Sequence, residues 1–281
     1  MGMTVNTNLS AINAQRNLSN TQNDLSKSLE KLSSGLRINR AADDAAGLSI
    51  SEGLRSQVNG YTVAARNAQD GISVIQTAEG ALTEVHSILQ RMRDLAVQGS
   101  NDSNNDASRA AIQKEADQLG AELNRIQEST NFNGIDLLKG GDPLKFQVGA
   151  DGNANNMIAV TLGDIATAVG TLADTDGSGA AGFDVADHTV AQTTIESIDT
   201  AIAAVSAQRS DLGAVQNRFE SAINSLNVGR ENLTAAESRI RDVDMAAEMV
   251  KFTRSNILSQ AGTSMLAQAN QSNQGVLNLL R

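Results

Sequence analysis

The stretch that decides the fold is IDTAIAAVSAQRSDLGAVQNRFESAINSLNVGRENLTAAESRI, residues 198–240. Every seventh residue of this stretch is apolar: Ile198, Val205, Leu212, Phe219, Leu226, Leu233 and Ile240. A spacing of seven aligns side chains along one side of an α-helix, as in helices that pack in coiled coils or bundles. The spacing therefore predicts one long helix with a continuous apolar seam.

A second seam of similar length lies upstream, where apolar or small residues alternate at steps of four and three over residues 54–96, with one slip. Read as one helix, residues 48–98 would extend about 75 Å. A shorter helix over residues 107–128 shows the same steps. Because the two long seams match in length, they can lie side by side as a rod. The expected rod core is Leu54, Val58, Ile72, Ile75, Leu82, Leu89, Ile198, Val205, Leu212, Phe219, Leu226 and Leu233.

Four glycines interrupt the upstream seam, namely Gly53, Gly60, Gly71 and Gly80. Each costs about 1 kcal/mol relative to alanine inside a helix. Two interpretations stay open. Either another part of the chain comes close at these positions, or a strong helix tolerates them.

The two extreme ends repeat the seven-residue spacing more weakly. Between their apolar positions lie Asn, Gln, Ser and Ala, which bury little apolar surface. One buried Leu contributes about 1.5–3 kcal/mol, whereas ordering the backbone costs about 1–2 kcal/mol per residue. We therefore expect each end to be stable only when it packs against neighbouring copies of the chain. The positions expected to make this packing are Leu18, Leu25, Leu32, Leu258, Met265, Val276 and Leu280.

The centre of the chain has a β and loop pattern. Phe132-Asn133-Gly134-Ile135 holds an Asn-Gly turn signal. Residues 144–148 and 157–162 alternate apolar and polar side chains around a turn, which predicts a hairpin. Residues 163–187 are rich in Gly, Ala, Asp and Thr, and they predict a short surface excursion that buries little.

Composition favours slender helices over a thick core. The chain has no Trp, one Tyr, five Phe and one Pro. Its net charge of −10 is uneven, since residues 151–200 carry eight acidic and no basic side chains, whereas residues 251–281 carry three basic and no acidic ones. We expect the acidic centre to stay solvated and the ends to pack against copies of themselves. Nucleic acid is not an expected partner.

Several functional classes are disfavoured. The absence of Cys excludes disulfides, thiol catalysis and Cys-based zinc sites. Residues 1–10 carry neither a basic cluster nor an apolar run, so we expect no cleaved secretory signal. No apolar stretch is long enough to span a bilayer, so membrane insertion is not expected.

Catalytic chemistry finds little support. His86 and His188 are the only histidines, and neither stands in a partner motif. The pair Asp43-Asp44 has no histidine or metal partner nearby in sequence, and a place at the start of a helix explains it better. We therefore expect no catalytic residues and no cofactor.

Two stretches superficially resemble calcium loops. Residues 102–106 match the opening of an EF-hand, but Ala107 stands where the turn needs Gly, and Gln113 stands where a bidentate Glu is needed. Helix capping explains this stretch better. Residues 174–179 occur once and fit a solvated turn. We expect no metal site.

At this point the residues resemble a known family. Residues 33–48, SSGLRINRAADDAAGL, closely resemble the amino-terminal signature of bacterial flagellins. Residues 256–270, NILSQAGTSMLAQAN, and the ending Leu279-Leu280-Arg281 resemble the carboxyl-terminal signature. The likeness covers roughly residues 1–140 and 190–281, and such long matches are highly specific.

The resemblance implies a mainly α fold: a long coiled-coil or helical-bundle rod with paired N- and C-terminal helices and a small central β-hairpin region. It implies that residues 1–43 and 241–281 form the helical core of a filament. Residues 44–189 would supply the amino-terminal helices of the rod, the hairpin and a short variable outer segment. Residues 190–240 would supply the carboxyl-terminal helix of the rod.

The resemblance also implies a function and partners. The chain would be a structural, non-enzymatic subunit that polymerises with itself into the flagellar filament for motility. It would leave the cell unfolded through the flagellar type III export apparatus, and a secretion chaperone would bind its carboxyl end. In the assembled extracellular flagellum, hook-associated and cap proteins would be its further partners.

Residues 90–98 are similar to the flagellin segment that a vertebrate Toll-like receptor senses. By this likeness Gln90, Arg91, Leu95 and Glu115 are the expected recognition residues. The alternative for Leu95 is burial against the rod, as is usual for a residue on the apolar face of a helix.

Three other functions stay open. A hook–filament junction protein of the same family would share the terminal pattern, although the ending from Gln268 to Arg281 favours the filament subunit. An effector or translocator of a type III system would usually need an apolar hairpin, which is absent here. An enzyme is disfavoured because no site chemistry is found.

Overall fold

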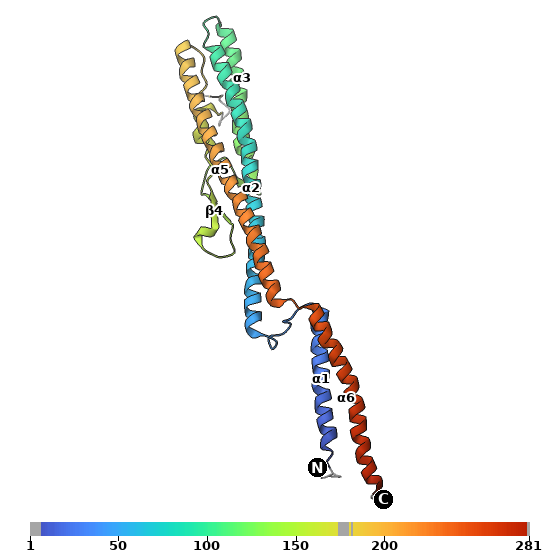
Figure 1. Ribbon diagram of the computed structural model, residues 1–281. Helices are drawn as coiled ribbons and strands as arrows, with labels where there is room; N and C mark the ends of the chain where they lie inside the picture. Colours follow the sequence, from blue (N-terminus) through green and yellow to red (C-terminus); the bar gives the residue numbers. More distant parts are fainter. Residues whose placement is uncertain (1–6, 174–179, 181, 280–281) are drawn as a thin grey trace. The chain divides into compact units, whose positions relative to one another are not determined.

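Figure 1 shows the computed structural model of the chain, which describes the backbone of residues 7–173, 180 and 182–279 and the side chains of these as far as residue 271. The helices are α1 (Leu9–Ser34), α2 (Ala45–Gly99), α3 (Asp106–Ser129), α4 (Ile165–Val169), α5 (His188–Arg241) and α6 (Met245–Leu279), with short 3-10 turns at Ala154–Asn156 and Gly170–Leu172. The strands are β1 (Asn131–Phe132), β2 (Ile135–Asp136), β3 (Leu144–Gln147) and β4 (Met157–Val160). The expected mainly α fold class with a small hairpin region is confirmed.

The chain forms two compact units. The terminal unit contains Met1–Val58 and Glu231–Arg281, and the central unit contains Asn59–Arg230. Helices α2 and α5 each run without a break through this division. α2 begins at Ala45, and α5 ends at Arg241.

In the central unit, α2, α3 and α5 lie side by side (Figure 1) and enclose one apolar core. Ile75, Leu82 and Leu89 of α2 meet the α5 seam in this core. All of the following are buried: Ile75, Leu82, Leu89, Ile198, Val205, Leu212, Phe219 and Leu226. A spacing of seven therefore does place one row of side chains on the inner side of each long helix.

Two small antiparallel pairs follow α3. β1 and β2 pair through Phe132 and Ile135, and the turn between them has positive φ angles at Asn133 (50°) and Gly134 (80°). Asn and Gly accept such angles with least strain, so the expected Asn-Gly turn is confirmed. β3 and β4 pair from Leu144 opposite Val160 to Gln147 opposite Met157. The expected hairpin is also confirmed.

Over its described residues, 163–173, 180 and 182–187, the next segment corrects one expectation, because it is not a surface excursion that buries little. The backbone of this segment is held by α3: Gln113 Nε2 donates to the carbonyl of Phe183 at 2.8 Å, and the amide of Ala180 donates to Asp117 Oδ1 at 3.2 Å. Its one described α-helix, α4, has only five residues, which is too short for a seven-residue row to reveal the apolar content of the segment. Its buried side chains are Ile165, Val169, Leu172, Ala173, Ala180, Phe183 and Val185.

The glycines of α2 divide between the two interpretations. A Cβ at Gly71 would lie 2.7 Å from the ring of Phe219, and one at Gly60 would lie 2.7 Å from Ala150. Close approach explains these two positions. Gly53 and Gly80 have nothing within 4 Å of such a Cβ, so the helix merely tolerates them.

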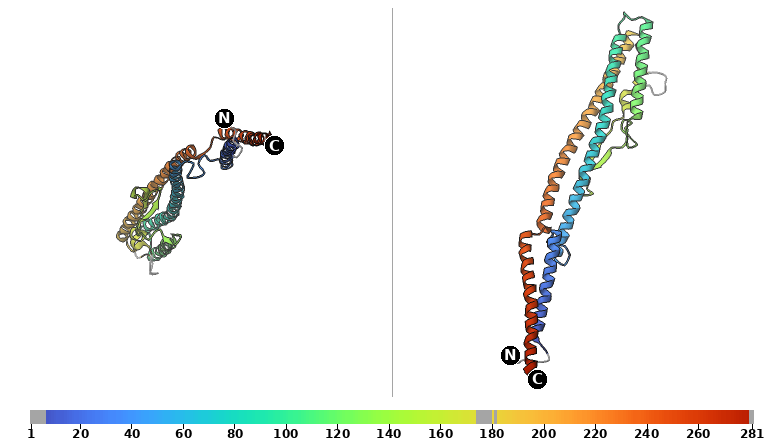
Figure 2. Two further views of the ribbon diagram at one scale, coloured as in Figure 1. Left: turned by 90° about the horizontal axis from the view of Figure 1, so that it is seen from below. Right: turned by 90° about the vertical axis from the view of Figure 1, so that its right-hand side faces the viewer.

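In the terminal unit, α1 and α6 lie side by side (Figure 2). α1 is capped at its start by the side chain of Asn8, which accepts from the amide of Ala11, and it ends at Gly35 in the left-handed conformation with φ 74°. Ile38 is the one buried hydrophobic side chain among the described residues of this unit. The terminal unit therefore has very little apolar core of its own.

Candidate functional site

The amino-terminal signature stretch links two distant parts of the chain within the terminal unit. The amide of Arg37 donates to the carbonyl of Arg241 at 2.6 Å, and the amide of Val243 donates to the carbonyl of Gly35 at 3.0 Å. The Arg37 guanidinium also donates to the carbonyl of Ile240, through Nε at 3.2 Å and Nη2 at 2.6 Å. These bonds satisfy carbonyls at the end of α5 that have no partner within the helix.

The two aspartates of the signature shape the turn before α2. Asp43 Oδ2 accepts from the amides of Asn39 and Arg40, and the hydrogen bond from Arg40 is the largest cause of its lowered pKa. Asp44 Oδ1 accepts from the amide of Gly47 at 2.8 Å and thereby caps α2. A Cβ at Gly47 would clash with the Asp44 carboxylate. Both aspartates therefore act in a turn and a helix start, as expected.

Polar contacts fix α1 against α6. Ser28 Oγ donates to Glu248 Oε1 at 2.7 Å, and Asn8 Nδ2 donates to the carbonyl of Ala269 at 2.9 Å. Glu248 is buried and also accepts from Lys251 Nζ at 3.0 Å. Burial by itself raises the pKa of Glu248, but the hydrogen bonds from Ser28 and Lys251 outweigh it, and the pKa is lowered. A buried polar pair of this kind favours one register of the two helices.

The residues expected to pack in a filament core are only partly covered. Leu18, Leu25 and Leu32 of α1 are half-buried. Leu258 and Met265 of α6 are 51% and 61% exposed. The side chain of Val276 and the whole of Leu280 lie outside the described residues.

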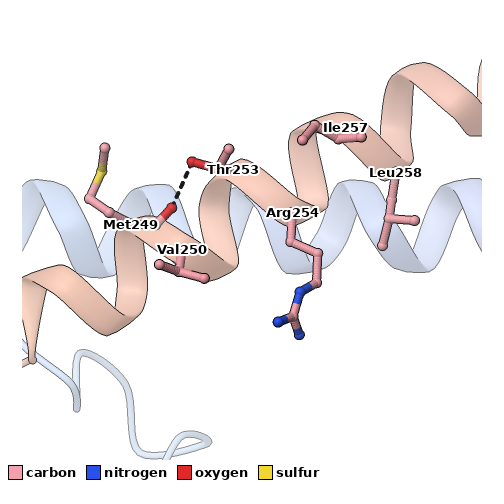
Figure 3. Close-up of a pocket in the computed structure, with 6 residues that line it drawn as sticks. All are labelled: Met249, Val250, Thr253, Arg254, Ile257 and Leu258. Atoms are coloured by element: carbon pink, nitrogen blue, oxygen red, sulfur yellow. Dashed lines mark hydrogen bonds between the residues drawn. The ribbon is translucent and has the colours of Figure 1, made fainter.

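Two apolar grooves meet at Leu258. One, of about 470 Å³, lies along α6 (Figure 3) and is lined by Met249, Val250, Thr253, Arg254, Ile257 and Leu258. The other, of about 410 Å³, lies between α1 and α6. Its lining residues are Ser10, Asn13, Ala14, Asn17, Leu18, Thr21, Leu258, Ala261, Gly262 and Met265.

Met249, Val250 and Ile257 were not among the residues expected from the sequence. The signal for them was present, since Met249-Val250 and Ile257-Leu258 are two apolar pairs eight residues apart on one helix. A single seven-residue row through Leu258 and Met265 includes none of these three residues. The exposed apolar surface of α6 is therefore wider than one seam.

The remaining residues expected in the rod core, Leu54, Val58, Ile72 and Leu233, are half-buried. Leu54, Val58 and Leu233 belong to the terminal unit, where few large side chains are available to cover them. Ile72 belongs to the central unit and packs against its core from the edge.

The expected receptor residues lie on two helices. Gln90, Arg91 and Glu115 are exposed, and Arg91 Nη2 of α2 contacts Glu115 Oε1 of α3 at 2.5 Å. Leu95 is 2% exposed and belongs to the apolar core. Three of the four side chains are thus available at the surface of the central unit, and the fourth is inside it.

The loop that resembles an EF-hand and the two histidines make hydrogen bonds to neighbouring parts of the chain. Asn105 caps α3 by accepting from the amide of Ser108 at 2.8 Å, so the first loop that resembles a calcium site is a helix start. His86 contacts Gln90, and His188 contacts the carbonyl of Ser100 at 2.9 Å. Residues 174–179 lie outside the described residues. Over the described ranges, no three His, Cys, Asp or Glu side chains gather as a metal site would need.

The fold and these surfaces define a helical structural protein whose α6 exposes wide apolar surface. Over the same described ranges, no helix combines the length and apolar character needed to cross a membrane.

Comparisons with known proteins give the family. Residues 5–142 match the bacterial flagellin N-terminal helical region, and residues 195–280 match the bacterial flagellin C-terminal helical region. A flagellin of Halalkalibacterium halodurans is 54% identical over 99% of this chain and 100% of its own length. The flagellar filament 33 kDa core protein of Treponema phagedenis is 46% identical over the same shares. The crystal structure of Bacillus cereus flagellin is 31% identical, covers 57% of this chain and 88% of its own, and has a TM-score of 0.49.

The chain belongs to the bacterial flagellin family. It is a structural subunit that polymerises with itself into the flagellar filament. The alternative of a hook–filament junction protein is not favoured, because full-length relatives carry the names of flagellin and filament core protein.

Proposed function

We propose that copies of this subunit assemble by packing the apolar surfaces of α1 and α6 against those of neighbouring copies. The observation that carries the proposal is Leu258, which is half-exposed where two apolar grooves meet. The packing residues would be Leu18, Leu25, Leu32, Leu258, Met265, Val276 and Leu280.

The energetics support this packing. The terminal unit buries one hydrophobic side chain of its own among its described residues, and the helix pair therefore gains little from folding alone. Each Leu or Met covered by a neighbouring copy contributes about 1.5–3 kcal/mol. In a polymer every copy gains this contribution at each repeated contact, so assembly and ordering of the ends would be coupled.

The charge distribution supports the same surface. Helix α6 from Lys251 onward carries basic but no acidic side chains, and its grooves contain Arg254 as their one charged residue. Similar ends with few charges approach one another at little electrostatic cost.

The test is seeded polymerisation of the purified full-length chain with Leu258→Glu. A carboxylate at the junction of the grooves should abolish pelletable filament, because burying it removes its hydration, and an ion pair with Arg254 in the same groove does not offset that cost. Leu258→Met is the matched control, since it keeps volume and apolar character and should assemble normally. Filaments of ordinary yield from Leu258→Glu would overturn the proposal, and circular dichroism would check that both variants keep their helices.

We also propose the domain boundaries 1–43, 44–189, 190–240 and 241–281, with the rod core as expected from the sequence. Their support is the position of the helix ends beside residues 44 and 240. Brief trypsin treatment of the monomer should remove the first and last of these segments before it cuts α2 or α5 within the central unit. The same segments should resist trypsin in the filament.

The family resemblance supports further proposals. The chain would leave the cell through the flagellar type III export apparatus, with a secretion chaperone on its carboxyl end, and would act extracellularly beside hook-associated and cap proteins. It would have no enzymatic activity. Export is tested by comparing full-length chain in culture supernatant from cells with and without a working export apparatus, and equal amounts would contradict it.

We propose that the free monomer activates the vertebrate flagellin-sensing Toll-like receptor through Gln90, Arg91 and Glu115. Leu95 would act indirectly, by holding α2 against the core, because its side chain is buried. Arg91→Ala should reduce reporter signalling, with Arg125→Ala as a matched control that loses another exposed arginine–glutamate pair on the surface of α3. Unchanged signalling in Arg91→Ala would refute the site.

A further inference from the structure

The methionines of this chain differ sharply in exposure. Met92 is fully buried in the central core, whereas Met249 is 50% and Met265 is 61% exposed on α6. The chain has no cysteine, so its thioethers are its only sulfur groups. An oxidant that attacks sulfur therefore reaches α6 without competition from a thiol in the same molecule.

Of the exposed methionines on α6, Met249 and Met265 line the grooves that the proposed function uses, whereas Met245, which is 48% exposed, lines neither groove. Met249 lies in the groove along α6 (Figure 3), where its side chain extends from the helix near Thr253. Met265 lies in the groove between α1 and α6, together with Leu18. Leu258 lines both grooves, so a change at either methionine alters the surface that surrounds it.

We propose that Met249 and Met265 form a peroxide-sensitive modification site, and that their oxidation in the unassembled subunit blocks polymerisation. This inference rests on the proposed function of the α1 and α6 surfaces. The co-reactant is hydrogen peroxide or an alkyl hydroperoxide.

The chemistry is a transfer of one oxygen atom. A lone pair of the methionine Sδ attacks an oxygen of the peroxide, the S–O bond forms and the O–O bond breaks. The transferred oxygen gives up its proton, and the second oxygen of the peroxide takes up this proton and leaves as water or an alcohol. Sulfur loses two electrons and the peroxide gains them. The product is a sulfoxide, which is polar and accepts hydrogen bonds, whereas the thioether was apolar.

Oxidation would disfavour polymerisation because assembly moves the sulfoxide from water into a buried contact. Assembly would bury this oxygen in a groove whose lining near Met249 is mostly aliphatic. Even where Arg254 or Asn17 donates to it, the oxygen loses its hydrogen bonds to water and the apolar contacts of the thioether are lost, and both losses disfavour the assembled state. In the free subunit the same oxygen stays in water, so the folded monomer is not affected.

The experiment treats the purified full-length monomer with hydrogen peroxide and removes the peroxide with catalase. Peptide mass spectrometry then locates each added oxygen, and light scattering follows elongation from untreated seeds. We expect Met92 to stay unmodified, the exposed Met157, Met245, Met249 and Met265 to be oxidised, and elongation to slow at least about tenfold with circular dichroism unchanged. Treatment with both classes of methionine sulfoxide reductase should restore the rate.

Two sets of variants assign the effect to these residues. Met249→Leu/Met265→Leu should elongate normally after peroxide, whereas Met157→Leu, which removes an exposed methionine of the central unit, should stay sensitive. Met249→Gln/Met265→Gln introduces polar groups without peroxide and should elongate as slowly as the oxidised chain, whereas Met157→Gln should be normal. The glutamine variants test whether a polar group at these two positions slows elongation, even if the leucine substitutions disturb the packing.

The proposal is overturned if the oxidised chain, or Met249→Gln/Met265→Gln, elongates at the untreated rate. Its failure can be separated from failure of the proposed function. If Leu258→Glu still polymerises, the proposed surface itself is wrong. If Leu258→Glu is blocked but the oxidised chain polymerises, the surface stands and only the methionine site is lost.

Discussion

Helices α5 and α6 are both long and continuous, yet they differ in what their apolar side chains touch. α5 buries a row of residues from Ala191 to Leu226 in the central unit. On α6, Glu248 is the one buried side chain among those described, and Ile257 and Leu258 are exposed. Helix formation and the presence of apolar residues therefore do not make a core. Coverage by other elements does.

The physical reason is the number of neighbours. In the central unit, α5 is covered by more than one element: Phe219 is fully buried, faces Gly71 of α2 and meets the ring of Phe146 of β3. In the terminal unit, α1 has α6 as its helical partner, and a helix pair leaves most of each helix in solvent. The central unit is thus stabilised within one copy, and the terminal unit depends on other copies.

The largest expected effect on the free energy of unfolding comes from truncating one apolar side chain to alanine in each of the two units. Phe219→Ala removes a fully buried ring that meets Phe146 edge-on at 5.6 Å, and it should lower the free energy of unfolding by about 3–5 kcal/mol. Leu258→Ala on α6 should lower it by no more than about 1 kcal/mol in the monomer, because the side chain is half-exposed. Urea unfolding of both variants measures the difference, and equal losses would contradict it.

A smaller effect is expected from adding one methyl group to α2. Gly71→Ala places a Cβ against the ring of Phe219 and should destabilise the central unit by about 1–3 kcal/mol. Gly80→Ala is the matched control on the same helix, where the space is open, and it should stabilise by about 0.5–1 kcal/mol. Opposite shifts of the thermal midpoint are the expected result. Shifts of the same sign would show that Gly71 is merely tolerated.

A pH dependence should distinguish the terminal unit. The pKa of Glu248 is lower in the folded chain than its ordinary value of 4.5, so its contribution is complete above that value and is lost as the pH falls below it. Ser28→Ala removes the hydrogen bond to Glu248 and should reduce stability by about 1 kcal/mol at neutral pH. NMR titration of Glu248 in both forms measures the shift. A pKa in Ser28→Ala equal to that of the parent chain would contradict the assignment.

The smallest effect is expected from the surface pair of Arg91 and Glu115. Both side chains are about half-exposed, and water and salt weaken their attraction. A double-mutant cycle with Arg91→Ala and Glu115→Ala should give a coupling of about 0.2–1 kcal/mol. A larger coupling would mean that this pair, and not only the apolar seams, holds α2 against α3.

Much of the central unit could be predicted because its patterns are local. The seven-residue row from Ile198 specifies one side of a helix by spacing alone, and Asn133-Gly134 specifies a turn by its backbone preferences. Phe183 could not be placed in this way, because no period surrounds it. Its burial depends on α3, whose Gln113 supplies the hydrogen bond that holds it.

The candidate site also has residues that local patterns predict and residues that only tertiary contacts reveal. The sequence marked Leu258 and Met265 as packing residues through their spacing, but it did not reveal that Met249 and Ile257 widen the exposed surface, nor that Ser28 and Glu248 meet across two helices. Ser28 and Glu248 are 220 residues apart in the chain.

The sequence by itself determined the long helices, the apolar side of each and the turns at Asn133-Gly134 and in the hairpin, because these follow from spacing and backbone preference within a few residues. Only the tertiary structure decided which apolar sides are covered. The row on α5 is enclosed by α2 and α3, whereas Met249, Leu258 and Met265 of α6 stay open to solvent beside α1. The reason is that burial depends on how many elements converge on a surface, and that number is set by contacts between residues far apart in the chain.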